Sequence, residues 1–372
     1  MKETLHIKNF GPIKEVKLEL GKVNVLIGDQ GTGKSTVAKL LHILYTTSID
    51  TDEADLAQII GSDDQMTDRT SVFLRRLKQN GLSKYLRGDS YIEFNRPQAG
   101  TFFYNRNDAQ ATYHYLNDDP ISDIHHSNSV YIPAERMFIA AVFENIFALN
   151  QLDIVLPEYF NKYAQLLNRI STEYSELDFS KILGVKYKFV DGKIKILRND
   201  SNVFLDIKES SSGVQTLMPI YLYLHHLLQI KGIDEKGRFL LSIEELEMNS
   251  FPHVQNETVK KIIEANYYQT KNNTLLTTHS PYILTSLNNL MYAYIVGQNH
   301  PKKVSTLIPQ EYWLNPDEVS AYMLVYDEKV GGCVEMNIID EETKLIDSIR
   351  IDGVSDMLSD EFNKIMEIGL AE

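Results

Sequence analysis

Residues 22–45 read KVNVLIGDQGTGKSTVAKLLHILY, and this stretch decides the fold. Its first six residues are apolar enough for a buried strand, and its last ten repeat apolar side chains at the three- and four-residue spacing of a helix. Between them, residues 28–35 have the spacing G-x-x-x-x-G-K-S. A strand, a glycine-rich turn and a helix in this order predict a loop whose backbone N–H groups face an anion.

This loop and the threonine after it supply the first candidate binding residues. The glycines let the backbone wrap phosphate groups, Lys34 reaches the terminal phosphates of ATP, and Ser35 coordinates Mg²⁺. Because the flanking strand and helix have the right order, we favour this interpretation over a glycine turn with a solvated lysine. The candidate ATP-binding residues are Gly28, Gln30, Gly31, Thr32, Gly33, Lys34, Ser35 and Thr36.

Short alternating segments lie on either side of this unit. Residues 4–10 and 14–20 place apolar side chains at every second position, which predicts two strands next to the one at 22–27. Residues 185–199, VKYKFVDGKIKILRN, predict a hairpin, because an Asp-Gly pair suits the positive φ angles of a tight turn. Strands alternate with helices in the rest of the sequence, so the core sheet should be largely parallel.

Between residues 46 and 184 the pattern is less regular. Helical spacing recurs at residues 136–147 and 156–174, a strand is predicted to end in VYIPAER at 130–136, and residues 101–116 are aromatic and compatible with strands.

Three acidic residues follow the apolar run FLLSI, namely Glu244, Glu245 and Glu247. Carboxylates at the end of a buried strand are costly unless a cation or a water molecule is handled there. Glu244 is therefore a candidate Mg²⁺ ligand, directly or through water, and Glu245 a candidate catalytic residue that polarises the attacking water. Glu247 receives no role. A solvated strand end is the alternative, and the upstream phosphate loop favours the catalytic interpretation.

Two further motifs lie on either side of these acids. Residues 211–215, SSGVQ, begin an apolar helix, where Ser212, Gly213 and Gln215 are candidate ligands of a second anion site. An ordinary serine N-cap is the alternative. His279, in LLTTHSP, is a candidate catalytic residue near the γ-phosphate or the attacking water, although a lone histidine is more often structural.

Taken in order, GDQGTGKST, SSSGVQ, LLSIEELE and LLTTHSP resemble the Walker A, signature, Walker B and histidine-switch motifs of ABC-type ATPases. The opening IKNFGPI, the phrase VYIPAER and the ending TTHSP look most like the soluble SMC, RecF and OLD branch, rather than transporter subunits. The resemblance covers nearly the whole chain. It implies ATP and Mg²⁺ as cofactors and ATP hydrolysis as the reaction.

In ATPases of this type two heads pair head to tail, and each signature loop closes on the ATP held by the opposite phosphate loop. The resemblance therefore implies a homodimer or a higher homo-oligomer. In it, Ser212 and Gly213 would contact the γ-phosphate of the partner's ATP, Glu245 would be the catalytic carboxylate, and His279 the switch.

Three positions depart from the usual motifs. Glu244 stands where an aspartate is usual, Leu246 where proline is common, and Val214 where a second signature glycine is common. These departures favour slow hydrolysis. By the same resemblance, Glu135 and Arg136 of VYIPAER would lie near the nucleotide, with no role assigned.

The expected fold class is α/β, an ABC-type ATPase head with N-terminal antiparallel strands, a largely parallel P-loop core sheet and an inserted helical lobe. Residues 1–45 and 185–310 would form the core, residues 46–184 an inserted, mainly helical lobe that includes the VYIPAER strand, and residues 311–372 a mixed C-terminal element packed on the core. We find no equivalent of the OLD nuclease domain after Leu290 and no long coiled-coil arms. The chain therefore resembles an ATPase that acts on a separate effector.

The composition limits the setting. A chain of 372 residues with 43% hydrophobic content can bury a core. Cys333 is the single cysteine, so no disulfide can form within one chain, and the sequence has neither a signal-peptide pattern nor an apolar run long enough to span a membrane. We expect a cytoplasmic protein without a membrane partner. The net charge of -14 provides no general attraction for DNA, which would need a local basic patch.

The resemblance favours an ATP-driven dimeric switch that regulates a separate effector, such as a nuclease, or a DNA transaction, as similar stand-alone ATPases do in bacterial antiphage defence. Two alternatives stay open. One is a RecF-like DNA-repair ATPase, which needs a basic groove. The other is an ATP-binding assembly scaffold with little turnover, which Glu244 and Val214 suggest.

Overall fold

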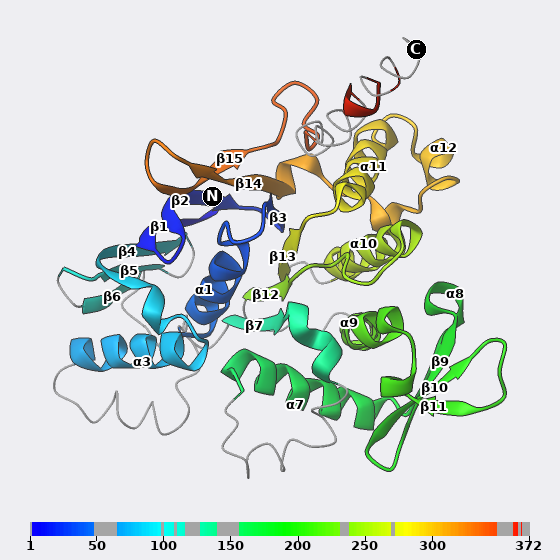
Figure 1. The fold of residues 1–372 in the computed structure, drawn as a ribbon. Coiled ribbons are helices and arrows are strands. Elements are labelled where there is room, and N and C mark those ends of the chain that lie inside the picture. The colour runs from blue at the N-terminus through cyan, green and yellow to red at the C-terminus, as the bar shows by residue number, and fades with distance from the viewer. Residues whose placement is uncertain are drawn as a thin grey trace.

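The computed structural model describes residues 2–47, 65–97, 100–107, 110–115, 127–139, 156–230, 238–268, 272–347, 360–363 and 366. These residues form an 11-stranded sheet, a separate four-stranded sheet and the helices around them (Figure 1). The strand order of the large sheet is β6-β5-β4-β1-β2-β15-β14-β3-β13-β12-β7. Its strands are β1 (Glu3–Phe10), β2 (Ile13–Leu20), β3 (Val23–Gly28), β4 (Leu86–Arg96), β5 (Gly100–Asn105), β6 (Gln110–Tyr115), β7 (Ser127–Ile132), β12 (Arg238–Ile243), β13 (Asn272–Thr278), β14 (Val319–Asp327) and β15 (Gly332–Asn337).

Strand β3 lies at the centre of the parallel part of the large sheet. Every residue of β3 is buried, as expected for a near-continuous apolar strand with neighbours on both sides. It pairs in parallel with β13 and β14, and β12 pairs in parallel with β13 and β7. The carboxyl ends of β3, β12 and β13 therefore lie at one edge of the sheet, which is where α/β proteins bind ligands.

The other part of the large sheet is antiparallel. Strand β1 pairs with β2 and β4, and β5 pairs with β4 and β6, all in antiparallel register. Buried and less buried side chains alternate along much of these strands, as a sheet with one face toward the core requires. The predicted N-terminal antiparallel strands and largely parallel core are thus confirmed.

Helix α1 is enclosed by the large sheet, which curves around it in Figure 1. It packs against β3, β13, β12 and β7, while α10 packs against β13, α9 and α11. The long helices are α1 (Lys34–Thr47), α3 (Gln65–Gln79), α7 (Glu158–Glu173), α9 (Ser212–Gln229), α10 (Pro252–Tyr268) and α11 (Pro281–Gly297). No helix in these described ranges has both the length and the apolar character needed to span a bilayer.

The four-stranded sheet confirms the predicted hairpin. Strands β9 and β10 pair in antiparallel register, and the turn between them uses positive φ angles of 52° at Asp191 and 74° at Gly192. Figure 1 shows this sheet beside the start of α9. The strands are β8 (Glu176–Phe179), β9 (Val185–Val190), β10 (Lys193–Arg198) and β11 (Phe204–Asp206). Two short helices are α8 (Ser180–Leu183) and α12 (Pro301–Ser305).

The structure adds two details to the predicted division of the chain. Strands β4, β5 and β6 lie in the segment expected to be mainly helical, yet they extend the antiparallel part of the large sheet. Strands β14 and β15 come from the C-terminal element expected to pack on the core, yet they lie inside the sheet between β3 and β2. Local patterns predict that a strand exists but not which edge it pairs with, so these positions required the tertiary structure. The domain boundaries themselves stay a prediction.

The helix predicted at residues 136–147 is only partly testable. A 3₁₀ turn covers Ala134–Phe138, and residues 140–147 lie outside the described part of the chain.

Candidate functional site

The phosphate loop connects β3 to α1 and depends on three glycines with positive φ angles. The φ angles are 146° at Gly28, 79° at Gly31 and 100° at Gly33, values that residues with a side chain rarely adopt. A Cβ atom on Gly28 would also lie 2.3 Å from the carbonyl oxygen of Leu324 in β14. The central position of β14 therefore fixes the start of the loop.

Lys34 begins α1 and is buried, with 6% of its surface exposed. Its Nζ donates to the carbonyl oxygens of Gly28 at 2.7 Å and Asp29 at 2.8 Å. Burial lowers the pKa of Lys34, while the nearby Glu245 carboxylate acts in the opposite direction. The ammonium group thus lies within the loop, where it can exchange two carbonyl partners for phosphate oxygens.

A pocket of about 250 Å³ lies beside this loop. It brings Glu245 and His279 to the P-loop from two neighbouring strands, as the parallel core predicts. The pocket is smaller than the roughly 300–1,000 Å³ of sites that enclose a whole ligand, so it can enclose the phosphates and leave one side of ATP uncovered. Its lining residues are Pro12, Gln30, Gly31, Gly33, Lys34, Ser35, Thr36, Tyr85, Glu245, Thr277 and His279.

Gly28 and Thr32 belong to the predicted set but do not line the pocket; they shape the loop instead. The Thr32 hydroxyl donates to the Asp29 carbonyl oxygen at 2.8 Å.

Tyr85 is a pocket residue that the sequence did not single out. Its ring lies against Gly11, where a Cβ atom would come within 2.6 Å of it, and it packs edge-on against Phe10 with ring centroids 6.0 Å apart. With 37% of its surface exposed, the ring offers an aromatic face at the rim of the pocket. Such a face can stack on a purine base.

Glu244 follows β12 and is 2% exposed. Its Oε2 accepts a hydrogen bond of 3.3 Å from the backbone N–H of Ala134, whereas its Oε1 is buried and accepts none within the described part of the chain. A buried carboxylate oxygen without a partner is costly, and a divalent cation would satisfy it. The unpaired oxygen is thus compatible with the predicted role of Glu244 as a Mg²⁺ ligand, but Glu244 does not line the pocket, whereas the exposed Ser35 does.

Glu245 has an unusual backbone conformation with a φ angle of 43°. Its N–H donates to the Thr277 hydroxyl at 3.1 Å, and its carbonyl oxygen accepts from Arg136 Nη2 at 2.8 Å. A residue with a side chain adopts this left-handed conformation at a cost of about 1–2 kcal/mol, so contacts on both sides must hold it. They direct the Glu245 side chain to the pocket that it lines.

Glu247, which the sequence left without a role, holds the histidine loop. Its Oε1 accepts from the backbone N–H of His279 at 2.6 Å, and its Oε2 accepts from the Thr278 hydroxyl at 2.7 Å. Charge-assisted bonds of this kind are short and strong. Glu247 therefore positions His279 rather than contacting the pocket itself.

Arg136 was also left without a role, and the structure shows it completely buried. Its guanidinium donates to backbone carbonyls of the β7 end, of Glu244 and Glu245, and of α9. Burial lowers its pKa to about 10. Glu135, by contrast, is exposed and does not line the pocket.

The signature residues do not meet the phosphate loop of their own chain, since none of them lines its pocket. Ser211 caps α9 by accepting from the Val214 N–H, and Ser212 is exposed. A Cβ atom on Gly213 would lie 2.8 Å from the Asn249 carbonyl oxygen. The Gln215 amide donates to the carbonyl oxygens of Ser210 at 2.8 Å and Lys208 at 3.1 Å, just before the loop. Gln215 therefore supports the loop instead of facing a ligand.

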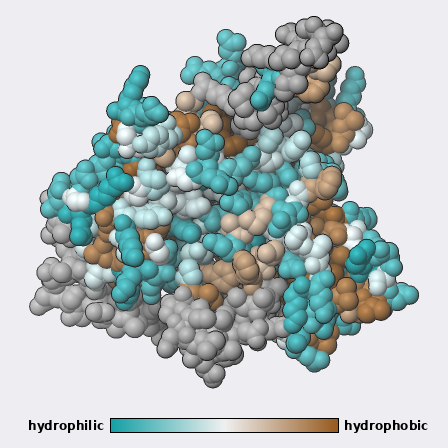
Figure 2. Space-filling view, in the orientation of Figure 1, coloured by the Kyte–Doolittle hydropathy of each residue, from teal (hydrophilic) through white to brown (hydrophobic). Residues whose placement is uncertain are grey.

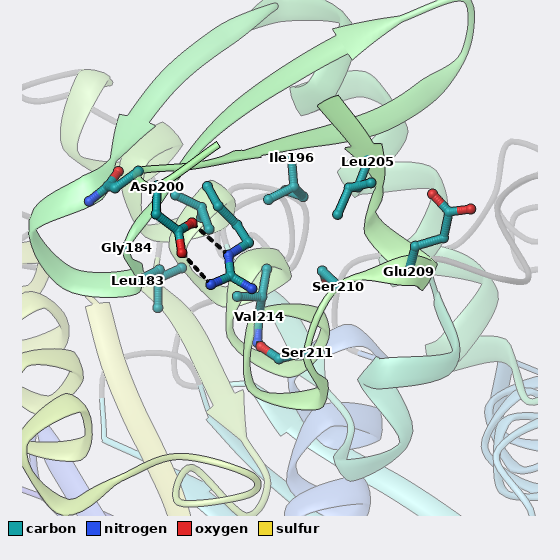
Figure 3. A pocket seen from close by; sticks show the side chains of 12 residues that line it. Leu183, Gly184, Ile196, Asp200, Leu205, Glu209, Ser210, Ser211 and Val214 are labelled. Carbon is teal, nitrogen blue, oxygen red and sulfur yellow. Dashed lines mark hydrogen bonds and ion pairs between the residues drawn. The ribbon is translucent and has the colours of Figure 1, made fainter. Parts of the chain in front are cut away.

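A second, larger pocket of about 480 Å³ lies behind the signature loop (Figure 3). Figure 3 shows Ile196 of β10 and Asp200, which lies in the turn after β10, facing Ser211 and Val214 at the start of α9. Its arginine and aspartate, Arg198 and Asp200, are paired with each other at 2.7 and 2.9 Å. This pocket lies between the small sheet and the signature loop, and none of the phosphate-loop residues lines it.

Comparisons with known proteins identify the family of the chain. The AAA ATPase domain family matches residues 1–131 and 126–284. None of the curated proteins matches the chain. Solved structures with a similar course of the chain include an SMC head domain from Thermotoga maritima, with 12% identity over 91% of this chain and 99% of that one and a TM-score of 0.43. Another is the recombination mediator protein RecF, with 14% identity over 91% of this chain and 97% of that one and a TM-score of 0.40.

Proposed function

Because this chain belongs to the AAA ATPase domain family, we propose that it binds ATP with Mg²⁺ at the phosphate loop and hydrolyses it. The convergence of Lys34, Glu245 and His279 on one pocket carries this proposal, since they come from three different elements. A phosphate-binding cation, a carboxylate and an imidazole at one edge of the sheet can bind phosphate and orient the water that attacks it.

Each residue has a defined task in this reaction. Lys34 leaves the Gly28 and Asp29 carbonyl oxygens and binds the terminal phosphates. Glu245 orients the attacking water and accepts its proton, and Glu247 keeps His279 in place beside the γ-phosphate. Mg²⁺, held by Ser35 and Glu244, would neutralise charge on the phosphates.

The active form that we propose is a head-to-tail pair, or a higher assembly of such pairs. The pocket of one chain leaves part of ATP uncovered, while Ser212 is exposed at a helix N-terminus that carries no nucleotide of its own chain. Free N–H groups there suit an anion. The signature loop of one copy would thus cover the ATP held by the other.

The mass of Glu245→Gln in solution, with and without ATP and Mg²⁺, tests this proposal. The substitution removes the base but keeps the shape of the site, so ATP should accumulate between paired chains and double the mass. Glu245→Gln combined with Lys34→Ala is the matched control and should stay single. If Glu245→Gln binds ATP and has the mass of a single chain throughout, the signature loop does not act on a partner, whereas a paired mass already present without ATP means that assembly does not need nucleotide.

We further propose that the pair is a switch for a separate effector, with a nuclease as the class suggested by similar ATPases of antiphage defence. The trapped Glu245→Gln pair is the form with which to test binding of a candidate nuclease. ATPase stimulation by DNA that weakens with salt would instead favour a RecF-like role. Full biological activity of Glu245→Gln would favour an assembly scaffold.

A further inference from the structure

The most enclosed charge near the site belongs to Arg136, which is 0% exposed. Its Nε donates to the carbonyl oxygen of Thr216 at 3.1 Å, and its Nη1 donates to Glu244 O at 2.6 Å and to Pro133 O at 3.1 Å. The remaining Nη2 donates to Glu245 O at 2.8 Å. All four of these acceptors are backbone carbonyl oxygens, so the guanidinium fixes the positions of those backbone segments relative to each other.

The segments joined in this way belong to the two halves of the proposed reaction. Thr216 lies in the first turns of α9, directly after the signature residues 211–215. Glu244 and Glu245 follow β12, and Glu245 lines the pocket of the same chain. In a head-to-tail pair, α9 faces the partner's ATP while Glu245 faces the chain's own ATP. Arg136 therefore connects two different nucleotides.

A second contact reinforces this connection. The Asn249 amide donates to the Thr216 hydroxyl at 3.1 Å, and the Asn249 carbonyl oxygen lies so close to Gly213 that a Cβ there would be 2.8 Å away. Asn249 follows the acidic residues and has a φ angle of 55°. A shift of the signature helix would thus reach the acidic segment at both ends.

The backbone conformation of Glu245 makes the position of this residue sensitive to such a shift. Its positive φ angle is held between Thr277 and Arg136, so displacement of the arginine removes one of the two supports. A small displacement of a catalytic group is enough to change a rate substantially.

Building on the proposed function, we infer that Arg136 couples the two ATP sites of a pair. When the signature loop closes on the partner's ATP, the Arg136–Thr216 contact, supported by Asn249, sets the backbone of Glu245 for hydrolysis of the chain's own ATP. Arg136 is a positioning residue, because it acts through Glu245 and touches no nucleotide.

A mixed pair tests the coupling. One chain carries Ser212→Glu and the other Lys34→Ala, and two different tags allow the pair to be purified. Only the first chain binds ATP, and that ATP meets the intact signature loop of the second chain. The first chain's own signature loop faces an empty pocket. We expect turnover per filled site to fall about tenfold below the wild-type pair, within the usual range of coupling between sites. Wild-type turnover per filled site would overturn the inference.

Arg136→Lys then tests the residue itself. Lysine has a single ammonium and cannot reach the three segments that the planar guanidinium joins. In the otherwise wild-type pair, turnover should fall to about the level of the mixed pair, with the Kd for ATP unchanged. Placed in the ATP-binding chain of the mixed pair, Arg136→Lys should lower turnover no further. Equal losses in both backgrounds would show a merely structural role and refute the coupling.

Asn249→Gly keeps the test decisive if Arg136→Lys does not fold. Glycine accepts the positive φ angle and removes the amide that contacts Thr216. The same pattern is expected, a loss of turnover in the wild-type pair and none in the mixed pair, and an equal loss in both contradicts the inference. If two Glu245→Gln chains never pair in the presence of ATP, the proposed function fails instead. The two failures can therefore be told apart.

Discussion

The phosphate-loop pocket and the signature loop differ in how much of a site one chain completes. In the pocket, Lys34 is buried, and Glu245 and His279 line the same space. At the signature loop, Ser212 is exposed, and the contacts of Gln215 lie behind the loop. One region is assembled within a single chain, whereas the other presents an exposed surface. Substitutions in the phosphate-loop pocket should abolish ATP binding. Substitutions in the signature loop should leave ATP binding intact and abolish only the pairing that follows it.

The largest expected effect separates Lys34→Ala from Ser212→Glu. Removing a buried cation that binds phosphates costs about 2–5 kcal/mol, so the affinity for ATP should fall more than thirtyfold in Lys34→Ala. Ser212→Glu places a negative charge where a phosphate would approach but suits a helix N-terminus, so the fold should be retained. A labelled-ATP binding titration should show unchanged affinity in Ser212→Glu, and mass in solution should show no pairing.

Gln165→Glu adds the same charge to the exposed face of α7 and serves as the control for Ser212→Glu. If Gln165→Glu also prevents pairing, the effect of Ser212→Glu is general repulsion and the contrast between the two regions is lost.

An intermediate effect is expected for Gly213→Ala. The added Cβ would lie 2.8 Å from the Asn249 carbonyl oxygen, so the signature loop or the acidic segment must shift. Overpacking of this kind costs about 1–3 kcal/mol, which should weaken ATP-dependent pairing about tenfold. Gly88→Ala meets open space and should change nothing. Sedimentation of both variants in the Glu245→Gln background measures the pairing constant.

The smallest effect concerns Tyr85 at the rim of the pocket. If its ring stacks on the base, Tyr85→Ala should weaken ATP binding about two- to tenfold, the usual contribution of an aromatic pair, while Tyr85→Phe retains binding. Inorganic triphosphate, which has no base, should bind Tyr85→Ala and the wild type equally. An equal loss of triphosphate affinity would instead show that Tyr85 supports the phosphate loop through its contact with Gly11.

Much of the candidate site follows from local sequence. The loop at residues 28–35 needs its glycines at fixed spacing, and the acids and His279 need only to end parallel strands, which bring them to one edge. The roles of Glu247 and Arg136 did not follow, because each depends on a partner distant in sequence. Glu247 binds the backbone at residue 279, and Arg136 contacts residues 80 and more positions away.

By itself the sequence determined the strand, loop and helix unit, the hairpin at the Asp-Gly turn and the identity of the groups at the strand ends. Periodicity and turn chemistry are local properties, so they can be read without knowing the partners. Only the tertiary structure decided that β14 lies beside β3, where the Leu324 carbonyl meets Gly28, and that Arg136 joins α9 to the acidic segment. Pairing between distant strands and burial of a charge depend on the whole fold, because both bring together residues that are far apart in the sequence.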